Sequence, residues 1–431
     1  MSKKFAKYRM QVYAKPALKD NACAFMNIGE SIQYLAMEQI LKEIGVEEKD
    51  TIDITADEVR NYHGDTLYLP GKFILNDREI NNILPFPKGI KPIFVSSVML
   101  KNEVVKPELI EYLKHNEPIG CRDEQARNML REYGIEAYLM GCFTMCISHR
   151  ENNPLNGKVF LVDVSENLEK YIPENLRRDA IKISHAIPVN TTVMNREEDE
   201  KLNLYAKTLL EQYKNEAKLV ITSRLHAAAP CLAMGIPVIL ASDNIDFRYS
   251  WIDKFIPIYT LDEYDNIDWN PKPVNTDIVK NLITTYLKKY KNNDTTYIQE
   301  LKKLDEYYID RKRTDYYGYF KKRIISACNK YMDGKFKYVI WGAGLHSGYA
   351  YDIIKELYPK AELVAVTDKY ERGIRFGKDI ICGDSLNAKT YFDIAFITTK
   401  PGTPEGINKM EEIFGEKAKE HYLVITSQQK S

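Results

Sequence analysis

The stretch at residues 219–241 constrains the fold most, because it reads as a single β-loop-α-β unit. Its apolar start, residues 219–222, predicts a buried parallel strand. Ser223 is expected to cap the following helix. Gly235 is expected to end that helix before a second strand at 238–241. This order of elements favours an α/β fold with parallel sheets.

Arg224 and His226 fall where this strand ends and the helix begins. Open α/β sheets bind ligands at the carboxyl ends of their strands, and free N–H groups at a helix start favour an anion. The arginine fork matches a phosphate or carboxylate, and histidine titrates near neutrality. We therefore expect an anion site here. The alternatives are a surface ion pair for Arg224 and a buried core imidazole for His226.

Length and composition exclude several classes of protein. The chain has 431 residues, enough for two or three domains, and its formal net charge of +0 gives no global field for nucleic acid or an anionic membrane. The basic N-terminus lacks an apolar core and no apolar run reaches ~18 residues, so neither a signal peptide nor a transmembrane helix is expected. Seven scattered cysteines indicate reduced thiols and a cytoplasmic location. Cys142 and Cys146 lack a second ligand pair, so no metal site is expected.

Other strand ends carry further candidates. A first strand is expected at 8–14, and Asn27-Ile28-Gly29-Glu30 then opens a helix on which Gln33 faces the same loop. For Glu30 the alternative is compensation of the helix dipole. The glycine allows a close approach of a ligand to the backbone.

Arg122 and Asp123 also lie between the end of a strand and the start of a helix, because a short strand precedes them and a helix that ends at Gly134 follows them. Their alternative is pairing with each other. His185 ends a strand predicted at 181–185, and a plain loop histidine is the alternative. Arg248 lies in an aromatic and polar loop that could line a sugar site or pack into the core.

The C-terminal segment predicts a small Rossmann-like βαβ module. A strand at 337–341 leads into Gly342-Ala343-Gly344 and a helix that carries Gly348, and Asp368 ends the next strand. This context suits a nucleotide or nucleotide sugar, although the third glycine falls one place later than in the dinucleotide fingerprint. A ligand-free packing or assembly domain is the alternative.

Four motifs follow one another along the chain: Asn27-Ile28-Gly29-Glu30 with Gln33, Arg122-Asp123, Gly141-Cys142-x-Thr144, and Arg224-Leu225-His226 with Gly235-Ile236-Pro237-Val238. Taken together, they resemble the polysaccharide pyruvyl transferase family over roughly residues 8–260. The resemblance implies two Rossmann-like halves facing a cleft in the GT-B arrangement. It also implies transfer of the enolpyruvyl group of phosphoenolpyruvate to a sugar as a pyruvate ketal. The family usually has Gly-Asp where this chain has Gly29-Glu30, which moves the carboxylate by over ~1 Å.

We therefore expect an α/β protein with four parts: an N-terminal half (1–150), a second half (151–268), a helical connector (269–334) and a C-terminal domain (335–431). The expected function is pyruvyl transfer in surface polysaccharide biosynthesis. Phosphoenolpyruvate is the co-substrate, no further cofactor is required, and the acceptor is a saccharide that is free, lipid-linked or nucleotide-linked. Homo-oligomerisation stays open. The alternatives are a glycosyltransferase that uses a nucleotide sugar and a non-catalytic saccharide-binding scaffold.

Each candidate residue has an expected role. His226 is the acid or an anion donor, and Glu30 or Asp123 is the base for the sugar hydroxyl. The expected nucleotide site of the C-terminal domain comprises Gly342, Gly344, Gly348 and Asp368. The expected substrate-binding residues are Arg224, Arg122, Asn27, Gly29, Gln33, His185 and Arg248.

Overall fold

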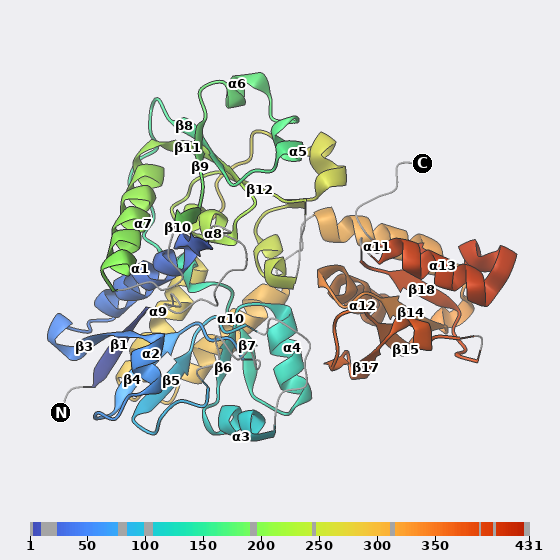
Figure 1. Cartoon of the computed structure of the whole chain (residues 1–431), viewed down its shortest axis with the longest axis horizontal. Coiled ribbons are helices and arrows are strands. Elements are labelled where there is room, and N and C mark those ends of the chain that lie inside the picture. The colour runs from blue at the N-terminus through green and yellow to red at the C-terminus, as the bar shows by residue number, and fades with distance from the viewer. Residues whose placement is uncertain are drawn as a thin grey trace.

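The computed structural model is an α/β protein built on parallel sheets (Figure 1). This confirms the α/β class expected from the sequence. The residues that it describes are 3–9, 24–75, 84–98, 107–189, 196–243, 247–310, 315–387, 389–399 and 402–425.

The first sheet is parallel throughout and has the order β3-β1-β4-β5. Strand β1 lies earlier than the predicted strand at 8–14, and residues 10–14 fall outside the described part of the chain. Strands β6 and β7 form a short parallel pair. A bridge between Ser97 and Cys121 joins this pair to the segment that follows β5 of the first sheet. The strands are β1 (Lys4–Arg9), β3 (Thr51–Thr55), β4 (Leu67–Gly71), β5 (Ile90–Phe94), β6 (Ile119–Cys121) and β7 (Ala137–Leu139). The helices of this half are α1 (Ile28–Glu43), α2 (Ala56–Arg60), α3 (Pro107–His115) and α4 (Glu124–Glu132).

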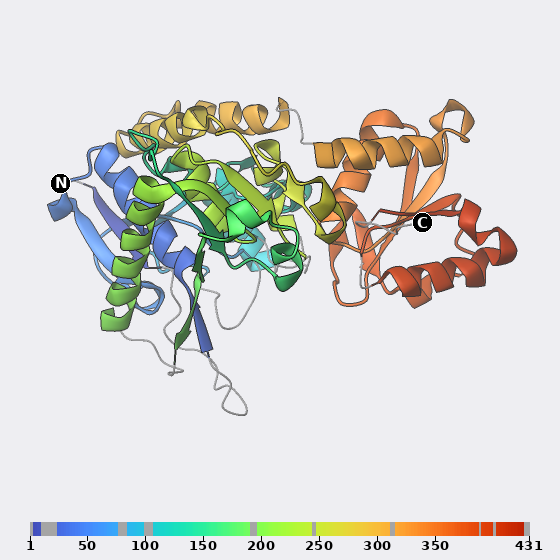
Figure 2. The same ribbon diagram turned by 90° about the horizontal axis from the view of Figure 1, so that it is seen from above.

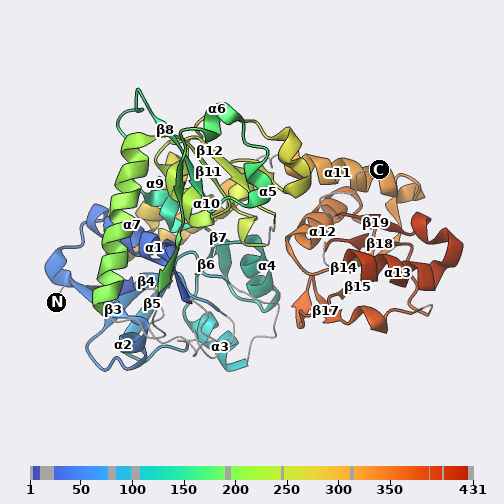
Figure 3. The same ribbon diagram turned by 45° about the horizontal axis from the view of Figure 1, so that its top comes forward.

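The second sheet is also parallel and has the order β13-β12-β11-β8-β9. Its long helix α7 lies beside α1 of the first half, as Figures 1 and 3 show. The strands are β8 (Lys158–Val162), β9 (Ile181–Ile183), β11 (Ala217–Thr222), β12 (Val238–Ala241) and β13 (Ile258–Tyr259). The helices are α5 (Glu166–Glu169), α6 (Glu174–Arg177), α7 (Arg196–Glu216) and α8 (Leu225–Ala233).

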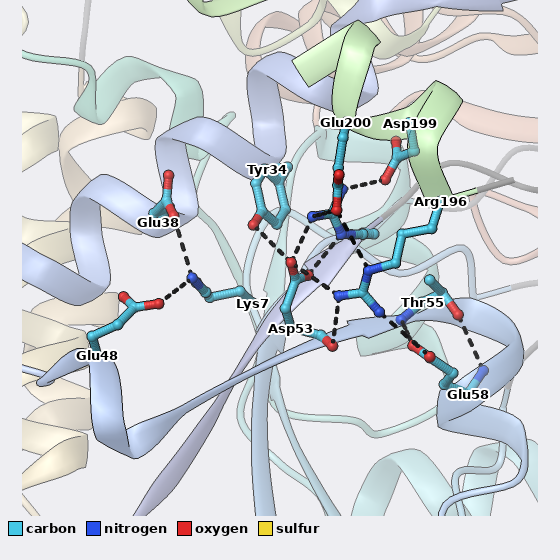
Figure 4. A network of polar contacts seen from close by, with 11 residues as sticks. Lys7, Tyr34, Glu38, Glu48, Asp53, Thr55, Glu58, Arg196, Asp199 and Glu200 are labelled. Atoms are coloured by element: carbon cyan, nitrogen blue, oxygen red, sulfur yellow. Dashed lines mark hydrogen bonds and ion pairs between the residues drawn. The ribbon is translucent and has the colours of Figure 1, made fainter. Parts of the chain in front are cut away.

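A strand pair and an ion-pair network are among the contacts that tie these halves together. Strands β2 (Ala24–Asn27) and β10 (Ala186–Val189) form an antiparallel ribbon that projects from the body in Figure 2. The ion-pair network includes Asp53, Arg196 and Asp199, which are labelled in Figure 4. Arg9 donates to Asp53 on β3 at 2.6–2.7 Å and to the buried Asp199 on α7 at 2.6 Å.

The three helices after the second half do not form a unit of their own. Helices α9 (Asp277–Lys291) and α10 (Tyr297–Asp310) pack on the first half, whereas α11 (Asp315–Cys328) packs on α12. Asp305 of α10 accepts bonds from Arg127 and Arg131 of α4 at 3.1 and 2.9 Å. The expected connector at 269–334 is therefore divided between the first half and the C-terminal module.

The C-terminal module has a six-stranded sheet in the order β16-β17-β15-β14-β18-β19, parallel except for the pair β16–β17. It lies to one side of the other two sheets (Figure 1). Its elements are β14 (Lys337–Trp341), α12 (Leu345–Leu357), β15 (Glu362–Thr367), β16 (Ile374–Arg375), β17 (Lys378–Ile381), β18 (Ile394–Ile397), α13 (Thr403–Phe414) and β19 (Tyr422–Val424).

The second and third sheets each bury side chains on both faces, which explains their nearly uninterrupted apolar strands. One large core cluster runs from the first sheet through the helices into the module, and a separate cluster covers the outer face of each of the other two sheets. Among the described residues, no helix has the length and apolarity needed to cross a membrane.

Candidate functional site

The candidate residues gather where the strands of the first two sheets end. Lys72 and Arg122 follow β4 and β6, and Asp163, His185 and Arg224 follow β8, β9 and β11. Parallel strands end at one edge of a sheet, so each sheet presents its polar residues along that edge.

Gly29 and His226 bring the two halves into direct contact. A Cβ built on Gly29 would lie 2.5 Å from Nδ1 of His226, closer than real Cβ contacts. Asn27 caps helix α1, since its Oδ1 accepts a bond from the N–H of Gly29 at 3.0 Å. Glycine is therefore needed here because the imidazole from the other half lies against the helix start.

The electrostatic surroundings of His226 are strongly positive. Burial lowers the pKa of its imidazole well below the ordinary value, and Arg122, Lys72 and Arg248 lower that pKa further. Its Nε2 atom is buried and has no hydrogen-bond partner among the described residues. The ring is therefore neutral at pH 7 and lies in a field that favours an anion.

Arg122 is the most informative of these cations. It is only 5% exposed, and its Nε is buried without a hydrogen-bond partner. Within the described part of the chain, its guanidinium makes no ion pair, including with its neighbour Asp123. A buried charge without an ion pair is costly, so this arginine is a candidate for pairing with an anion.

Glu30 lies across this site and pairs with a lysine that the sequence argument missed. Lys72 donates to both carboxylate oxygens of Glu30 at 2.9 and 3.1 Å, and its side chain is 11% exposed. Gln33 donates to the same carboxylate at 3.1 Å. The signal available in the sequence was that Lys72 directly follows a strand ending in Gly71.

Arg224, expected from the sequence to bind an anion, forms an ion pair with Asp163 of its own half. Its Nε donates to Asp163 at 2.9 Å, and its side chain is 40% exposed. Ser223 does not cap helix α8: Arg224 occupies the N-cap position, and the hydroxyl of Ser223 donates to the backbone oxygen of Asp163 at 2.7 Å. The predicted cap was wrong because α8 begins at Leu225, so that Ser223 lies one residue before the N-cap position.

His185 and Asp123 are both fully buried. His185 shares a hydrogen bond with the hydroxyl of Tyr213 at 3.0 Å, and burial with the charge of Arg224 lowers its pKa to about 4. Asp123 caps α4 by accepting a bond from the N–H of Ala126 at 2.9 Å. These positions favour supporting roles, since neither side chain reaches the surface.

The remaining candidates are placed as follows. Arg248 is exposed and contributes to the positive field at His226. Cys142 is buried next to Thr144, and burial raises the pKa of its thiol. No group of three or more His, Cys, Asp or Glu side chains among the described residues could hold a metal ion.

In the C-terminal module, three of the four expected nucleotide-site residues line one hollow. Gly342, Gly344 and Asp368 lie around a hollow of about 700 Å³. Gly348 lies elsewhere, because it is already inside α12 and borders a separate small gap beside Arg375. Its place in the glycine pattern therefore does not make it part of the hollow.

Comparison with known proteins gives one family. The family described as polysaccharide pyruvyl transferase matches residues 27–244, which contain all four motifs quoted above. A search of curated proteins found no match.

Two solved structures show weak similarity. One is an uncharacterized protein from Klebsiella pneumoniae, with 15% identity, coverage of 56% of this chain and 83% of the other, and a TM-score of 0.34. The other is a proposed UDP-N-acetylglucosamine 2-epimerase from Listeria monocytogenes, with 11% identity, coverage of 68% and 98%, and a TM-score of 0.34.

Proposed function

The chain belongs to the polysaccharide pyruvyl transferase family, and from that premise we propose that it transfers the enolpyruvyl group of phosphoenolpyruvate onto a saccharide as a pyruvate ketal. The first two sheets would act as the facing halves of a GT-B arrangement. The product would enter a surface polysaccharide. The observation that carries this proposal is the buried Arg122, which has no carboxylate partner among the described residues and lies in a cluster of cations around His226.

Phosphoenolpyruvate fits this cluster because it carries both a phosphate and a carboxylate. Arg122, Lys72 and Arg248 supply positive charge, and the N–H groups at the start of α8 supply oriented donors. A bound phosphate would compete with Glu30 for Lys72 and so release the carboxylate from its ion pair.

The reaction needs two hydroxyls of the acceptor. The first oxygen bonds to C2 of phosphoenolpyruvate while C3 gains a proton, and the second oxygen then displaces phosphate from C2. One hydroxyl proton is balanced by the proton added to C3, and the other leaves with phosphate. We assign His226 as the donor to C3, because the bound anion would raise its pKa and allow the imidazole to be protonated. Glu30 is assigned as the base, since Asp123 is fully buried as a helix cap.

The glycosyltransferase and scaffold alternatives give different results in one assay. The protein is incubated with phosphoenolpyruvate and candidate saccharides while phosphate release is followed. Release that requires both substrates supports transfer. Dependence on a nucleotide sugar without phosphoenolpyruvate favours the glycosyltransferase. Saccharide binding without release favours the scaffold.

Arg122→Met tests the observation itself. We expect the affinity for phosphoenolpyruvate to fall about 100-fold, because each charge-assisted hydrogen bond contributes about 1.5–3 kcal/mol. The free energy of unfolding should not fall, since a buried unpaired charge is removed. Arg178→Met, at an exposed arginine at the end of α6, is the control. Unchanged affinity in Arg122→Met would remove the basis of the proposed site.

A further inference from the structure

The hollow in the C-terminal module lies at a topological switch point of its sheet. Strands β14 and β18 are neighbours, yet the chain runs from β14 through α12 to β15 on the other side. Loops that follow β14, β15 and β18 line the hollow, and ligands bind at such a crevice in open α/β sheets. Its volume of about 700 Å³ is in the range of small-molecule sites.

The glycine loop leaves backbone exposed to this hollow. Gly342 has φ +104°, and a Cβ there would lie 2.7 Å from Cβ of Thr399. A Cβ on Gly344 would meet no atom within 4 Å. The thirteen-residue helix α12 starts directly after Gly344, so the positive end of its dipole lies at this end of the hollow.

Two buried polar groups that line the hollow have no hydrogen-bond partner among the described residues. They are Oγ1 of Thr367, a residue with 0% exposure, and Oε1 of Gln125, a residue with 4% exposure. Such groups are rare in folded proteins and call for an explanation. A ligand in the hollow would supply the hydrogen bonds that these two groups lack.

The charges around the hollow indicate which end of the ligand lies where. Asp368 ends β15, and its carboxylate accepts bonds from the N–H groups of Ala343 and Tyr370 at 2.9 Å. Glu371 and Asp384 also line the hollow. Its two lysines, Lys369 and Lys409, pair with Glu405 and Glu412, which line it too. Acceptors at this position suit the diol of a ribose, whereas phosphate suits the glycine loop and the start of α12.

We propose that this hollow binds the nucleoside diphosphate group of a free nucleotide or of a nucleotide sugar. One residue that lines the hollow, Gln125, comes from the N-terminal half. It belongs to α4, which begins directly after Arg122 and Asp123. The ligand therefore contacts both the module and the helix next to the candidate anion site. This nucleotide site does not depend on pyruvyl transfer: the chain could bind a nucleotide without the proposed activity, or have the activity without the nucleotide site.

Direct titration tests the site. ADP, GDP, UDP, CDP and UDP-glucose are titrated into the full chain by calorimetry, and Trp341, which lines the hollow, provides a fluorescence signal. At least one diphosphate should bind. Thr367→Val and Gln125→Leu should each weaken it about 3- to 10-fold, the value of one hydrogen bond, without lowering the melting temperature. Gly344→Leu, which fills open space, should weaken it about 100-fold.

The matched control is Asn203→Leu, because its Oδ1 is also buried without a partner among the described residues but lies on α7. Equal affinity for UDP and UDP-glucose identifies a free nucleotide as sufficient, and tighter UDP-glucose identifies a nucleotide sugar; both support the site. No binding of any probe at millimolar concentration overturns the proposal. So does binding that none of the three hollow variants weakens.

Discussion

Gly29 shows how one residue can depend on a partner almost two hundred positions away. Gly29→Ala would place a methyl group 2.5 Å from Nδ1 of His226. We expect the free energy of unfolding to fall by about 1–3 kcal/mol, the usual cost of overpacking, as measured by urea denaturation. Gly344→Ala is the matched control, since the added Cβ meets no atom within 4 Å.

The double variant Gly29→Ala with His226→Ala isolates the cause. Removing the imidazole should relieve the clash, so the double variant should lose less stability than the sum of the single changes. Additive losses would mean that the contact between Gly29 and His226 is not what requires glycine.

His226 should couple anion binding to proton uptake. In the free protein burial lowers its pKa, and the cations Arg122, Lys72 and Arg248 lower it further. A bound anion offsets those cations and raises the pKa. Binding of phosphoenolpyruvate should therefore take up protons at mildly acidic pH and lose this uptake as pH rises past the pKa of the complex. Calorimetry in buffers of different ionisation enthalpy measures the uptake.

The variant His226→Asn separates this effect from protonation of the ligand itself. Uptake that remains the same in His226→Asn would assign the proton to phosphoenolpyruvate and not to the imidazole. Stability gives a second check with a defined sign. Since the folded pKa is depressed, the contribution of His226 to stability is present above pH 6.5, its unfolded value, and is lost as pH falls below it.

At the scale of elements, a single carboxylate holds α10 against α4 and β7. Asp305 accepts bonds from Arg127, Arg131 and the N–H of Leu139, at 3.1, 2.9 and 2.7 Å. Asp305→Ala should lower the free energy of unfolding by about 3 kcal/mol, because partly buried cations lose their partner. Chemical denaturation measures the loss.

Glu306→Ala, at the exposed neighbouring position, is the control for Asp305→Ala and should change stability by less than about 0.5 kcal/mol. If Asp305→Ala also changed the free energy of unfolding by less than about 0.5 kcal/mol, apolar packing and not this carboxylate would hold α10 in place.

At the scale of the whole molecule, Arg9 on β1 links the N-terminal half to the second half through Asp199 on α7. Arg9→Met removes the ion pair between Arg9 and Asp199, a residue that is 1% exposed. We expect the free energy of unfolding to fall by about 3–5 kcal/mol, as it does when other buried ion pairs are broken. The double variant Arg9→Met with Asp199→Leu should recover much of this loss. If it recovers nothing, the two residues do not act as a pair.

The fold class and the motif positions could be predicted from the sequence because both signals are local. An apolar run predicts the buried strand at 219–222, which lies within β11 (Ala217–Thr222). A strand end next to a helix start marks where a polar residue can meet an anion. The family resemblance is confirmed by the match to residues 27–244. The antiparallel ribbon of β2 and β10 was not predictable in this way, since its strands are far apart in the chain.

The sequence by itself determined that Arg224 and His226 stand at the start of one helix, since the β-loop-α-β pattern of residues 219–241 sets that position. Only the tertiary structure decided their surroundings: Arg224 pairs with Asp163, whereas His226 lies against Gly29 among cations from the other half. The physical reason is that periodicity fixes which face of a strand or helix is buried. The choice among many chemically identical carboxylates depends on distances that only the packing of the sheets sets.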